Sequence, residues 1–512
     1  MRIIKSYIVA IIIGSLLFSA SSCKKNFGEI NTNPSVVITP DVGFLLTYAQ
    51  DRMMTYQYNE WIWESMEQLL RFTQHITSDP YELTNNVNSR YPAFYNDVLP
   101  NLTEIRRQIS LKADSTNYQK VSAVTYILQV LQGLKVTDMN GSIPYSEAAQ
   151  ARSGGKFDPV YDAQPELINN FIAQLDNAIT VLSNGSLANQ VALGSADVYY
   201  KGDYTKWVKL ANSIKLRIAA RLELKDNAKA QLLFQQVMQD ATGPITSTED
   251  QLTYQNIDYL PFGGGGEIDY RSTRYATTSI VNFMKKANDP RLPIYPADGT
   301  TNPTVAAYMK NPFPVGNTNS GNSVSNYFLI STVNKFFFSP KFNTPGGGEY
   351  KEVSLTAAET CLLIAEFIQK GFAGSVNTGG TAEDWYKKGV TASIKTMNDI
   401  AIEAQSTTGF GGDGTTEIDA YLADADVAFN GANDLERIYV QQYLNLFRNP
   451  NEAFVFSRRT GYPKFGSAYY ARENSNETIP RRFWTIDPGE TNRANWEAAM
   501  ADQNFTPNAQ DL

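Results

Sequence analysis

Residues 207–222 read WVKLANSIKLRIAARL, and this stretch says more about the fold than any other. Its apolar residues recur at spacings of three and four, so they share one side of an α-helix. The apolar stripe consists of Trp207, Leu210, Ala211, Ile214, Ile218 and Leu222. Lys209, Lys215 and Arg217 fall off the stripe. The pattern is typical of an amphipathic helix that packs on a neighbour through one face.

The same spacing recurs along the segment 41–243. Apolar residues follow it in 41–55, 59–76, 91–111, 117–137, 162–183, 203–225 and 227–240. Several of these stretches end at Gly or Pro, as at Gly185 and Gly243, where helices commonly stop. Successive amphipathic helices with short connections favour antiparallel pairs that bury their stripes on one another. We therefore predict a mostly α scaffold of stacked helix pairs over 41–243.

The pattern changes in residues 244–350, where we expect a loop-rich insert. Glycine runs occur at 263–266 and 346–348, with short Tyr- and Phe-rich runs between them. This composition predicts loops and short strands, with one helix near 276–287. A long irregular insert in a compact protein is usually functional, so we expect it to form the ligand-binding portion.

Helical spacing returns in the last segment, 351–512. It is found in 353–371, 382–404, 433–447 and 450–458. The final fifty residues or so are rich in Pro, Arg and Asn, and we predict them to be irregular and packed on the scaffold.

The N-terminus has the features of a secretory signal. Arg2 and Lys5 flank an apolar run at 7–18, shorter than the ~20 residues of a membrane-spanning helix. Small residues and then Cys23 follow, which resembles a bacterial lipoprotein signal. We therefore expect 1–22 to be cleaved, Cys23 to be lipidated and 23–40 to form a tether. An ordinary signal with an incidental cysteine is the alternative.

The composition excludes several kinds of chemistry. The 512 residues include one His and two Cys, too few for a His-built zinc site, a thiolate cage or a disulfide framework. The formal net charge of −8 argues against a nucleic-acid-binding surface. We expect no metal and no cofactor. We expect His75 to cap a helix end rather than to catalyse, and Cys361 to be a buried thiol in a helix.

The 29 Tyr, 26 Phe and 6 Trp suggest recognition of sugars, because aromatic faces can stack on sugar rings while polar side chains bind hydroxyls. In 59–76 the spacing places Met66 and Leu69 on a buried face, and Trp61 with Glu64, Ser65 and Gln68 on a polar face. An exposed Trp is a binding candidate, although packing of Trp61 under a neighbouring loop is the alternative. The candidate ligand-binding residues are Trp61, Arg90, Tyr91, Tyr270 and Tyr327.

Motifs spread over the chain indicate a family. They are CKKNF at 23–27, INTNP at 30–34, GSIPYSEA at 141–148, LANSIKLR at 210–217, DPRLP at 289–293, ERIY at 436–439, RRTGYP at 458–463 and IPRR at 479–482. In this order they resemble the SusD/RagB family of outer-membrane lipoproteins of Bacteroidetes, in particular its SusD-like family 2.

The resemblance implies a mostly α fold with about four tetratricopeptide-like helix pairs in a superhelical scaffold, plus a loop-rich ligand-binding portion. It also implies a lipoprotein of the outer membrane, facing the exterior. Such a protein captures a nutrient, usually a glycan, for a partner SusC-like TonB-dependent transporter and is not an enzyme. Arg458, Arg459, Arg481 and Arg482 are expected to tie the C-terminal tail to the helices. The family's ligand aromatics lie in variable loops, so no site residue transfers by motif.

We therefore expect a glycan-binding lipoprotein. A peptide-binding member of the same family is the first alternative. A glycoside hydrolase that uses a carboxylate pair and a structural or adhesion lipoprotein are the others.

Overall fold

The structure is a computed structural model. It describes residues 40–54, 59–77, 88–255, 275–297, 332–334, 351–404, 409–410, 412–464, 467, 479–483 and 485–505. The chain divides into two units, Met1–Val42 and Gly43–Leu512. Of the first unit only residues 40–42 are described. The predictions of a cleaved signal, a lipidated Cys23 and a tether therefore lie outside the described residues, apart from the last residue of the tether.

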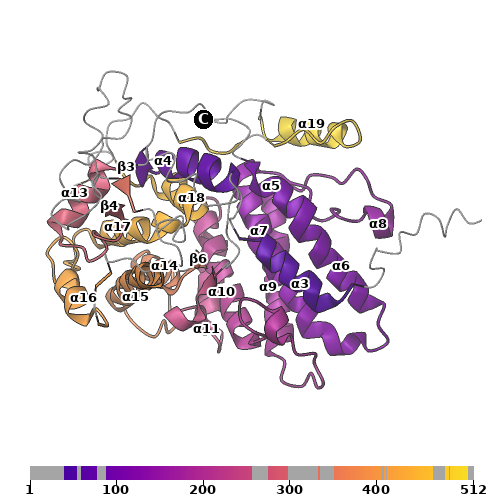
Figure 1. The fold of residues 1–512 in the computed structure, drawn as a ribbon, viewed down its shortest axis with the longest axis horizontal. Coiled ribbons are helices and arrows are strands. Elements are labelled where there is room, and N and C mark those ends of the chain that lie inside the picture. Colours follow the sequence, from indigo (N-terminus) through magenta and orange to yellow (C-terminus); the bar gives the residue numbers. More distant parts are fainter. Residues whose placement is uncertain are drawn as a thin grey trace, which may run out of the picture. The chain divides into compact units, whose positions relative to one another are not determined.

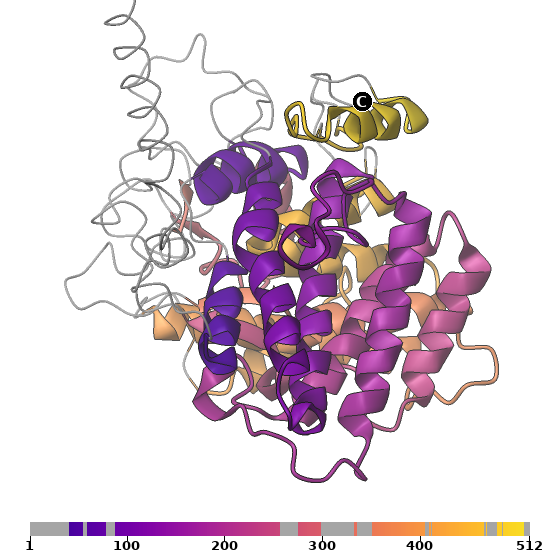
Figure 2. The ribbon, with the colours of Figure 1, turned by 90° about the vertical axis from the view of Figure 1, so that its right-hand side faces the viewer.

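Helices dominate the N-terminal half of the described chain. They are α3 (Val42–Arg52), η1 (Asn59–Leu69), α4 (Leu70–Phe72), α5 (Arg90–Ala93), η3 (Phe94–Val98), α6 (Leu99–Ser110), η4 (Ser115–Tyr118), α7 (Gln119–Asn140), α8 (Ala151–Gly154), α9 (Gln164–Ser183), η5 (Gly194–Ala196), α10 (Tyr204–Leu222), α11 (Asn227–Gln239) and η6 (Thr248–Asp250). Neighbours in sequence pack side by side, with α7 against α6 and α9, and α10 against α9 and α11. Figure 2 shows these helices as adjacent rods, which confirms the predicted stacking.

The C-terminal half continues the helical fold (Figure 1). Its helices are α13 (Thr278–Lys286), α14 (Ala357–Gln369), α15 (Ala382–Glu403), α16 (Thr415–Leu422), α17 (Asp434–Asn445), η10 (Leu446–Arg448), α18 (Pro450–Thr460) and α19 (Arg493–Asp502). Helix α14 packs on α15 and α17. The fold is therefore mostly α, as predicted, and every predicted helix has a counterpart.

Helix α19 corrects the prediction of an irregular C-terminal tail. Trp496, Ala499 and Met500 follow helical spacing and are buried together with Phe505, against the half-buried Tyr161. The surrounding Pro, Arg and Asn residues concealed this short apolar stripe. Helix α16 was not predicted either; its Ile418 and Tyr421 pack into the core that α14, α15 and α17 share.

The described strands are short and lie mostly in the insert. They are β1 (Ile76–Thr77), β2 (Leu252–Gln255), β3 (Tyr275–Ala276), β4 (Pro296–Ala297), β5 (Thr332–Val333) and β6 (Lys351–Leu355). The order of one sheet is β1-β3-β5-β4, and β2 pairs with β6 in the other. Where the insert is described, short strands and the helix α13 agree with the prediction. Strand β6 overlaps the start of the helix that was predicted at 353–371.

Helix α10 begins at a side-chain cap, and it is buried on more faces than its single apolar stripe predicted. The Asp203 carboxylate caps the helix by accepting from the backbone N–H of Thr205 at 2.9 Å, and Trp207 is fully buried. Lys215 and Arg217, which fall off the apolar stripe, are nevertheless 5% and 1% exposed. Because α10 contacts α7, α9, α11, α14 and α18, more than one of its faces is buried.

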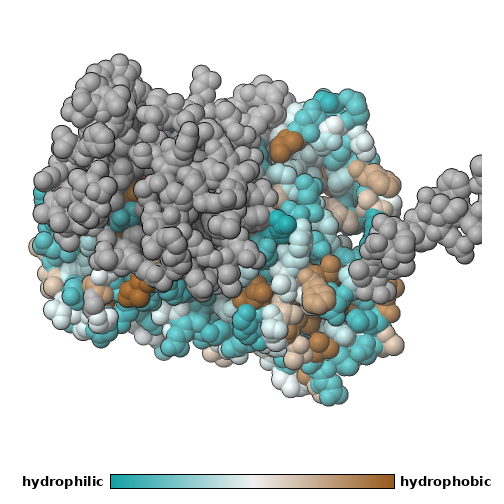
Figure 3. Space-filling model, viewed as in Figure 1, coloured by the Kyte–Doolittle hydropathy of each residue, from teal (hydrophilic) through white to brown (hydrophobic). Residues whose placement is uncertain are grey.

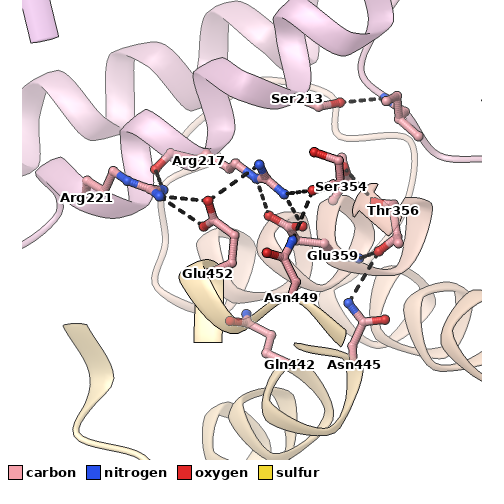
Figure 4. A network of polar contacts seen from close by, with 12 residues as sticks. Ser213, Arg217, Arg221, Ser354, Thr356, Glu359, Gln442, Asn445, Asn449 and Glu452 are labelled. Carbon is pink, nitrogen blue, oxygen red and sulfur yellow. Dashed lines mark hydrogen bonds and ion pairs between the residues drawn. The ribbon is translucent and has the colours of Figure 1, made fainter. Parts of the chain in front are cut away.

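Lys215 pairs with Asp176 of α9 at 2.7 Å, and a buried ion network explains how α10 tolerates Arg217 and the nearby Arg221. Arg217 Nε donates to Glu359 Oε1 of α14 at 2.5 Å. Arg221 Nη2 donates to Asp138 of α7 at 2.6 Å and to Glu452 of α18 at 2.9 Å. Figure 4 shows Arg217 and Arg221 directed from α10 toward Glu359 and Glu452. The network therefore links four helices that are far apart in sequence.

The arginines of the C-terminal motifs have two different roles. Arg458 donates to the backbone carbonyls of Arg481 and, at 3.0 Å, of Asp138. Arg482 Nη2 donates to the carbonyl of Gln503 at 2.7 Å. The Arg458 contacts confirm that this arginine ties the tail to helices α7 and α18, whereas the Arg482 contact lies within the tail itself. Arg459 instead pairs with Glu366 of α14 at 2.9 Å.

The described part of the face in Figure 3 is largely hydrophilic, with small apolar patches scattered among polar residues. None of the helices in the described ranges combines the length and hydrophobicity that crossing a bilayer requires.

Candidate ligand-binding site

Helix η1 places the first candidate residue, Trp61. It is a π-helix of 11 residues that runs directly into α4, and π-helical segments are frequent at functional sites. The structure describes the backbone of Trp61 but not its side chain. Glu64, Ser65 and Gln68, expected on the polar face with Trp61, are 0%, 1% and 3% exposed. That expectation was wrong, because η1 packs against α4 and α18 and a π-helix does not keep the 3.6-residue period.

Arg90, at the start of α5, is held inside the protein. It is 2% exposed, and its Nε donates to Glu60 Oε1 of η1 at 2.8 Å. Its Nη1 donates to the carbonyl of Met53 at 3.1 Å and to Gln132 Oε1 at 3.3 Å. We had expected Arg90 to orient ligand hydroxyls. In the structure its donors face internal acceptors, so its role there is to join η1, α5 and the end of α3.

Glu64 and Asn140 hold the segment just before α5 against η1 and α7. The backbone N–H of Ser89 donates to Glu64 Oε2 at 2.7 Å, and Asn140 of α7 donates to the Asn88 side chain. Burial and the nearby Glu60 carboxylate raise the pKa of Glu64 to about 8. Glu64 is therefore mainly neutral at pH 7. These contacts join η1, α5 and α7 into one frame.

Tyr91 lies on this frame and is half-buried. Its ring centroid is 4.5 Å from that of Tyr95, whose hydroxyl donates to the carbonyl of Pro144 at 2.6 Å. Burial of its phenol, with Tyr95 and Tyr161 nearby, raises the pKa of Tyr91 well above its ordinary value. The Tyr91 phenol is therefore neutral at pH 7 and lies within a cluster with Tyr95 and Tyr161, which leaves part of the half-buried side chain accessible.

The turn that carries the GSIPYSEA motif supports this aromatic group. Asp162 accepts from the backbone N–H groups of Tyr145 and Ser146, both at 2.9 Å. The Tyr145 hydroxyl then donates to Gln174 of α9 at 2.8 Å. The motif is thus structural, as expected, and it fixes Pro144, the acceptor of the Tyr95 hydroxyl.

His75 behaves as a helix cap. Its Nε2 donates to the carbonyl of Tyr443 in the last turn of α17 at 2.7 Å, so Nδ1 accepts from the Thr73 hydroxyl at 2.7 Å. The ring stacks on Tyr443 with centroids 3.9 Å apart. Burial lowers the pKa of His75 to about 3. His75 therefore caps a helix end, but the capped helix is α17, from a distant part of the chain, and not the helix that precedes His75, as we expected.

Cys361 is fully buried in α14, and burial raises the pKa of its thiol to about 12. It is a core residue, as predicted.

The structure brings two of the five candidates, Arg90 and Tyr91, onto one short helix beside η1, which carries Trp61. Tyr270 and Tyr327 lie outside the described residues. Sequence reasoning missed Glu60 and Tyr95, and it placed Glu64 on an exposed face although Glu64 is buried. Glu60 and Glu64 are four residues apart, so the sequence could have shown only that two neighbouring carboxylates on one helix face need a nearby cation. No local signal identifies Arg90 as that cation.

The comparisons with known proteins agree with these motifs. The SusD-like family model described as "Starch-binding associating with outer membrane" matches residues 32–484. None of the curated proteins compared with the chain is a significant match.

Among solved structures, the chain is similar to a chitin-binding protein, with 22% identity, a TM-score of 0.73 and coverage of 91% of this chain and 98% of the other. A chitin-binding SusD homolog from Flavobacterium johnsoniae has 20% identity and a TM-score of 0.70, with 91% and 96% covered. A SusD homolog from Bacteroides vulgatus has 21% identity and a TM-score of 0.69, with 91% and 96% covered. At sequence identities this low, the similarity to these structures shows a shared fold and nothing more.

Proposed function

The chain belongs to the SusD-like family, and we propose that it is a cell-surface lipoprotein that binds a glycan and delivers it to a partner SusC-like TonB-dependent transporter. The observation that carries this proposal is the family match over residues 32–484, whose description combines starch binding with the outer membrane. Two structural relatives described as chitin-binding support a glycan as the ligand. The proposed step is capture and delivery, without catalysis.

We propose that the ligand contacts the edge formed by η1 and α5 together with the insert. Trp61, Tyr91, Tyr270 and Tyr327 would supply stacking faces and hydroxyls. Arg90 would act indirectly, as a positioning residue, because Glu60 and the Met53 carbonyl already occupy its donors.

A binding titration tests the proposal. The full-length protein, purified in detergent, is titrated with malto-oligosaccharides, chito-oligosaccharides and peptides. We expect one glycan series to bind. Binding of peptides alone would support the peptide-binding alternative. Hydrolysis of a glycan that disappears on mutation of one carboxylate would show an enzyme.

Single alanine variants then test the site. Stacking of a nucleobase on an aromatic side chain is worth about 1–3 kcal/mol, and a sugar should lie at the lower end. Trp61→Ala and Tyr91→Ala should therefore weaken glycan binding by about five-fold or more. Tyr118→Ala is the matched control, because Tyr118 lies in η4 and contacts Lys112 instead of η1. Unchanged affinity in every candidate variant would exclude this site.

Cell fractionation tests the anchor and the partner. We expect Cys23→Ser to release the protein from the membrane fraction. We also expect affinity purification of the wild-type protein from its native outer membrane to recover a TonB-dependent barrel. Recovery of no barrel, together with no soluble ligand, would favour an adhesion role.

A further inference from the structure

Asparagine followed by glycine is a dipeptide prone to spontaneous deamidation, and it occurs in this chain at 140–141, 184–185 and 430–431. In this reaction the backbone nitrogen of the glycine attacks Cγ of the asparagine. Glycine favours the attack because it has no Cβ to hinder the approach and its backbone rotates freely. The reaction therefore needs an accessible asparagine side chain and a glycine N–H that no other group holds.

The pair Asn140-Gly141, at the end of α7, does not meet these conditions. Asn140 is 2% exposed, and its Nδ2 is held by the side chain of Asn88. The N–H of Gly141 donates to the Thr137 carbonyl at 2.8 Å and closes the last turn of the helix. Attack would break this bond and move a buried side chain, so we expect Asn140 to be stable in the folded protein.

The pair Asn430-Gly431 is exposed, but its backbone nitrogen is held. The Asn430 side-chain oxygen accepts from the N–H of Ala432 at 3.0 Å. The N–H of Gly431 donates to the two carboxylate oxygens of Asp434 at 3.2 and 3.0 Å. The attacking form of the amide nitrogen has lost its proton, and a neighbouring carboxylate disfavours that negative charge. We therefore expect Asn430 to react slowly as well.

The pair Asn184-Gly185 forms the same kind of turn without this obstacle. Asn184 is the C-cap residue of α9, and residues 184–186 are all exposed. The Asn184 side-chain oxygen accepts from the N–H of Ser186 at 2.9 Å, which keeps the amide beside the backbone and polarises its carbonyl. The N–H of Gly185 donates to no group in the described part of the chain. A Cβ at Gly185 would meet nothing within 4 Å, so the approach to Asn184 is open.

We propose that Asn184 is a site of spontaneous deamidation, which the fold selects from the three Asn-Gly pairs. The Gly185 nitrogen forms a bond to Cγ of Asn184 and gives up its proton through solvent. The side-chain nitrogen takes up a proton and leaves as ammonia, so a succinimide ring results. Water then opens the ring at either carbonyl and yields aspartate or isoaspartate. Both products carry a new carboxylate, and isoaspartate lengthens the backbone by one methylene group.

The new carboxylate lies at the C-terminal end of α9, where it is unfavourable. The last carbonyl groups of a helix carry partial negative charge, and the last turn of α9 has no basic residue. The segment that follows is held by η4, because the N–H of Val191 donates to the Asn117 carbonyl at 2.8 Å and Gln190 Nε2 donates to the Thr116 carbonyl at 2.9 Å. Deamidation therefore weakens the end of α9 and strains its connection to η4.

Incubation of the full-length protein at pH 6 and pH 8.5, in water labelled with a heavy isotope of oxygen, tests the proposal. Peptide mapping by mass spectrometry follows the incorporation of the isotope at each asparagine. We expect Asn184 to convert at least ten-fold faster than Asn140 or Asn430, and faster at pH 8.5 because the attacking nitrogen must lose its proton. Gly185→Ala should slow the reaction at least ten-fold and preserve the fold, since Gly185 does not have a positive φ and its side-chain position is open.

Two controls separate the effect of the fold from that of the dipeptide. In protein unfolded with urea, the three asparagines should convert at similar rates. In the folded protein, Asp434→Ala releases the N–H of Gly431 and should accelerate the conversion of Asn430 but not of Asn184. The proposal is overturned if folded Asn184 converts no faster than Asn430, if Asn184 keeps the same advantage in urea, or if Gly185→Ala converts like the wild type.

Discussion

Individual buried polar residues determine the local structure around η1. Glu64 is fully buried, holds the backbone of Ser89 and lies near Glu60, which is paired with Arg90. The Glu64 carboxyl group is more stable when protonated, because burial removes the water that would solvate its charge and because Glu60 places a second negative charge nearby. The frame under Tyr91 therefore depends on the protonation state of one side chain.

The raised pKa of Glu64 predicts a pH dependence of stability. Its pKa is about 8 in the folded protein against 4.5 as the ordinary value, so between these pH values the folded state holds a proton that the unfolded state has released. The free energy of unfolding should therefore fall as pH rises through this window, by about 2–4 kcal/mol. Glu64→Gln, which stays neutral, should remove most of this fall, as measured by urea unfolding at pH 5 and pH 8.5.

Glu497→Gln provides the control for this experiment, because Glu497 is exposed on α19. It should retain the pH dependence of the wild type. A Glu64→Gln variant with the same pH dependence as the wild type would show that Glu64 is ionised in the folded state at neutral pH.

At the scale of elements, close helix packing depends on small residues at the contacts. Gly389 of α15 faces α14, and a Cβ at this position would lie 2.7 Å from Leu362 Cγ and 3.2 Å from the Leu362 backbone nitrogen. Leu362 is fully buried, so it has little room to move. Gly133 of α7 is similar, since its Cβ would lie 2.9 Å from the Tyr145 ring.

Gly389→Ala should therefore destabilise the protein. Alanine is favoured over glycine in a helix by about 1 kcal/mol, but overpacking a core costs about 1–3 kcal/mol. We expect a net loss of about 1 kcal/mol in the free energy of unfolding, measured with urea. Gly154→Ala in α8 is the matched control, because its nearest neighbour would be 3.7 Å away, and it should be neutral or slightly stabilising. A stabilised Gly389→Ala variant would mean that α14 and α15 can separate without loss.

At the scale of the whole molecule, the ion network of Figure 4 joins segments that are distant in sequence. Glu452 of α18 accepts from Arg221 and lies 3.5 Å from Arg217 of the same helix α10. These two arginines, with Lys135, lower the pKa of Glu452 to about 2 against the burial that opposes ionisation. The ionised carboxylate is thus part of the folded state.

Glu452→Gln should leave two buried guanidiniums without their shared carboxylate. Removing one partner of a buried ion pair costs about 3–5 kcal/mol, and we expect a loss of this size in urea unfolding at pH 7. The loss should shrink as pH falls from 4.5 toward 2, because the wild-type carboxylate also becomes protonated there. The exposed pair of Glu490 and Arg493, 3.4 Å apart, gives the control. Glu490→Gln should cost well under 1 kcal/mol, and an equally small effect of Glu452→Gln would contradict the role of the network.

Most of the helices could be predicted from the sequence alone, because an amphipathic helix needs only local spacing and local end signals. The stripe in α10 and the segments that became α7, α9, α14 and α15 could be recognised in this way, and so could the motif order that indicates the family. The short stripe of α19 was too weak to stand out among Pro, Arg and Asn.

Which polar side chains are buried, and what each one contacts, depends on the packing of distant segments and was not predictable. His75 caps a carbonyl 368 residues away, and Arg217 pairs with a carboxylate 142 residues away. Arginine is a residue type that often contacts ligands, but the ion pair of Arg90 with Glu60 gives Arg90 a structural role. The spacing of residues within one helix cannot predict such partners, because the burial of a side chain depends on all the helices that pack against its own helix. The structural roles of these charged residues could therefore not be predicted from the sequence.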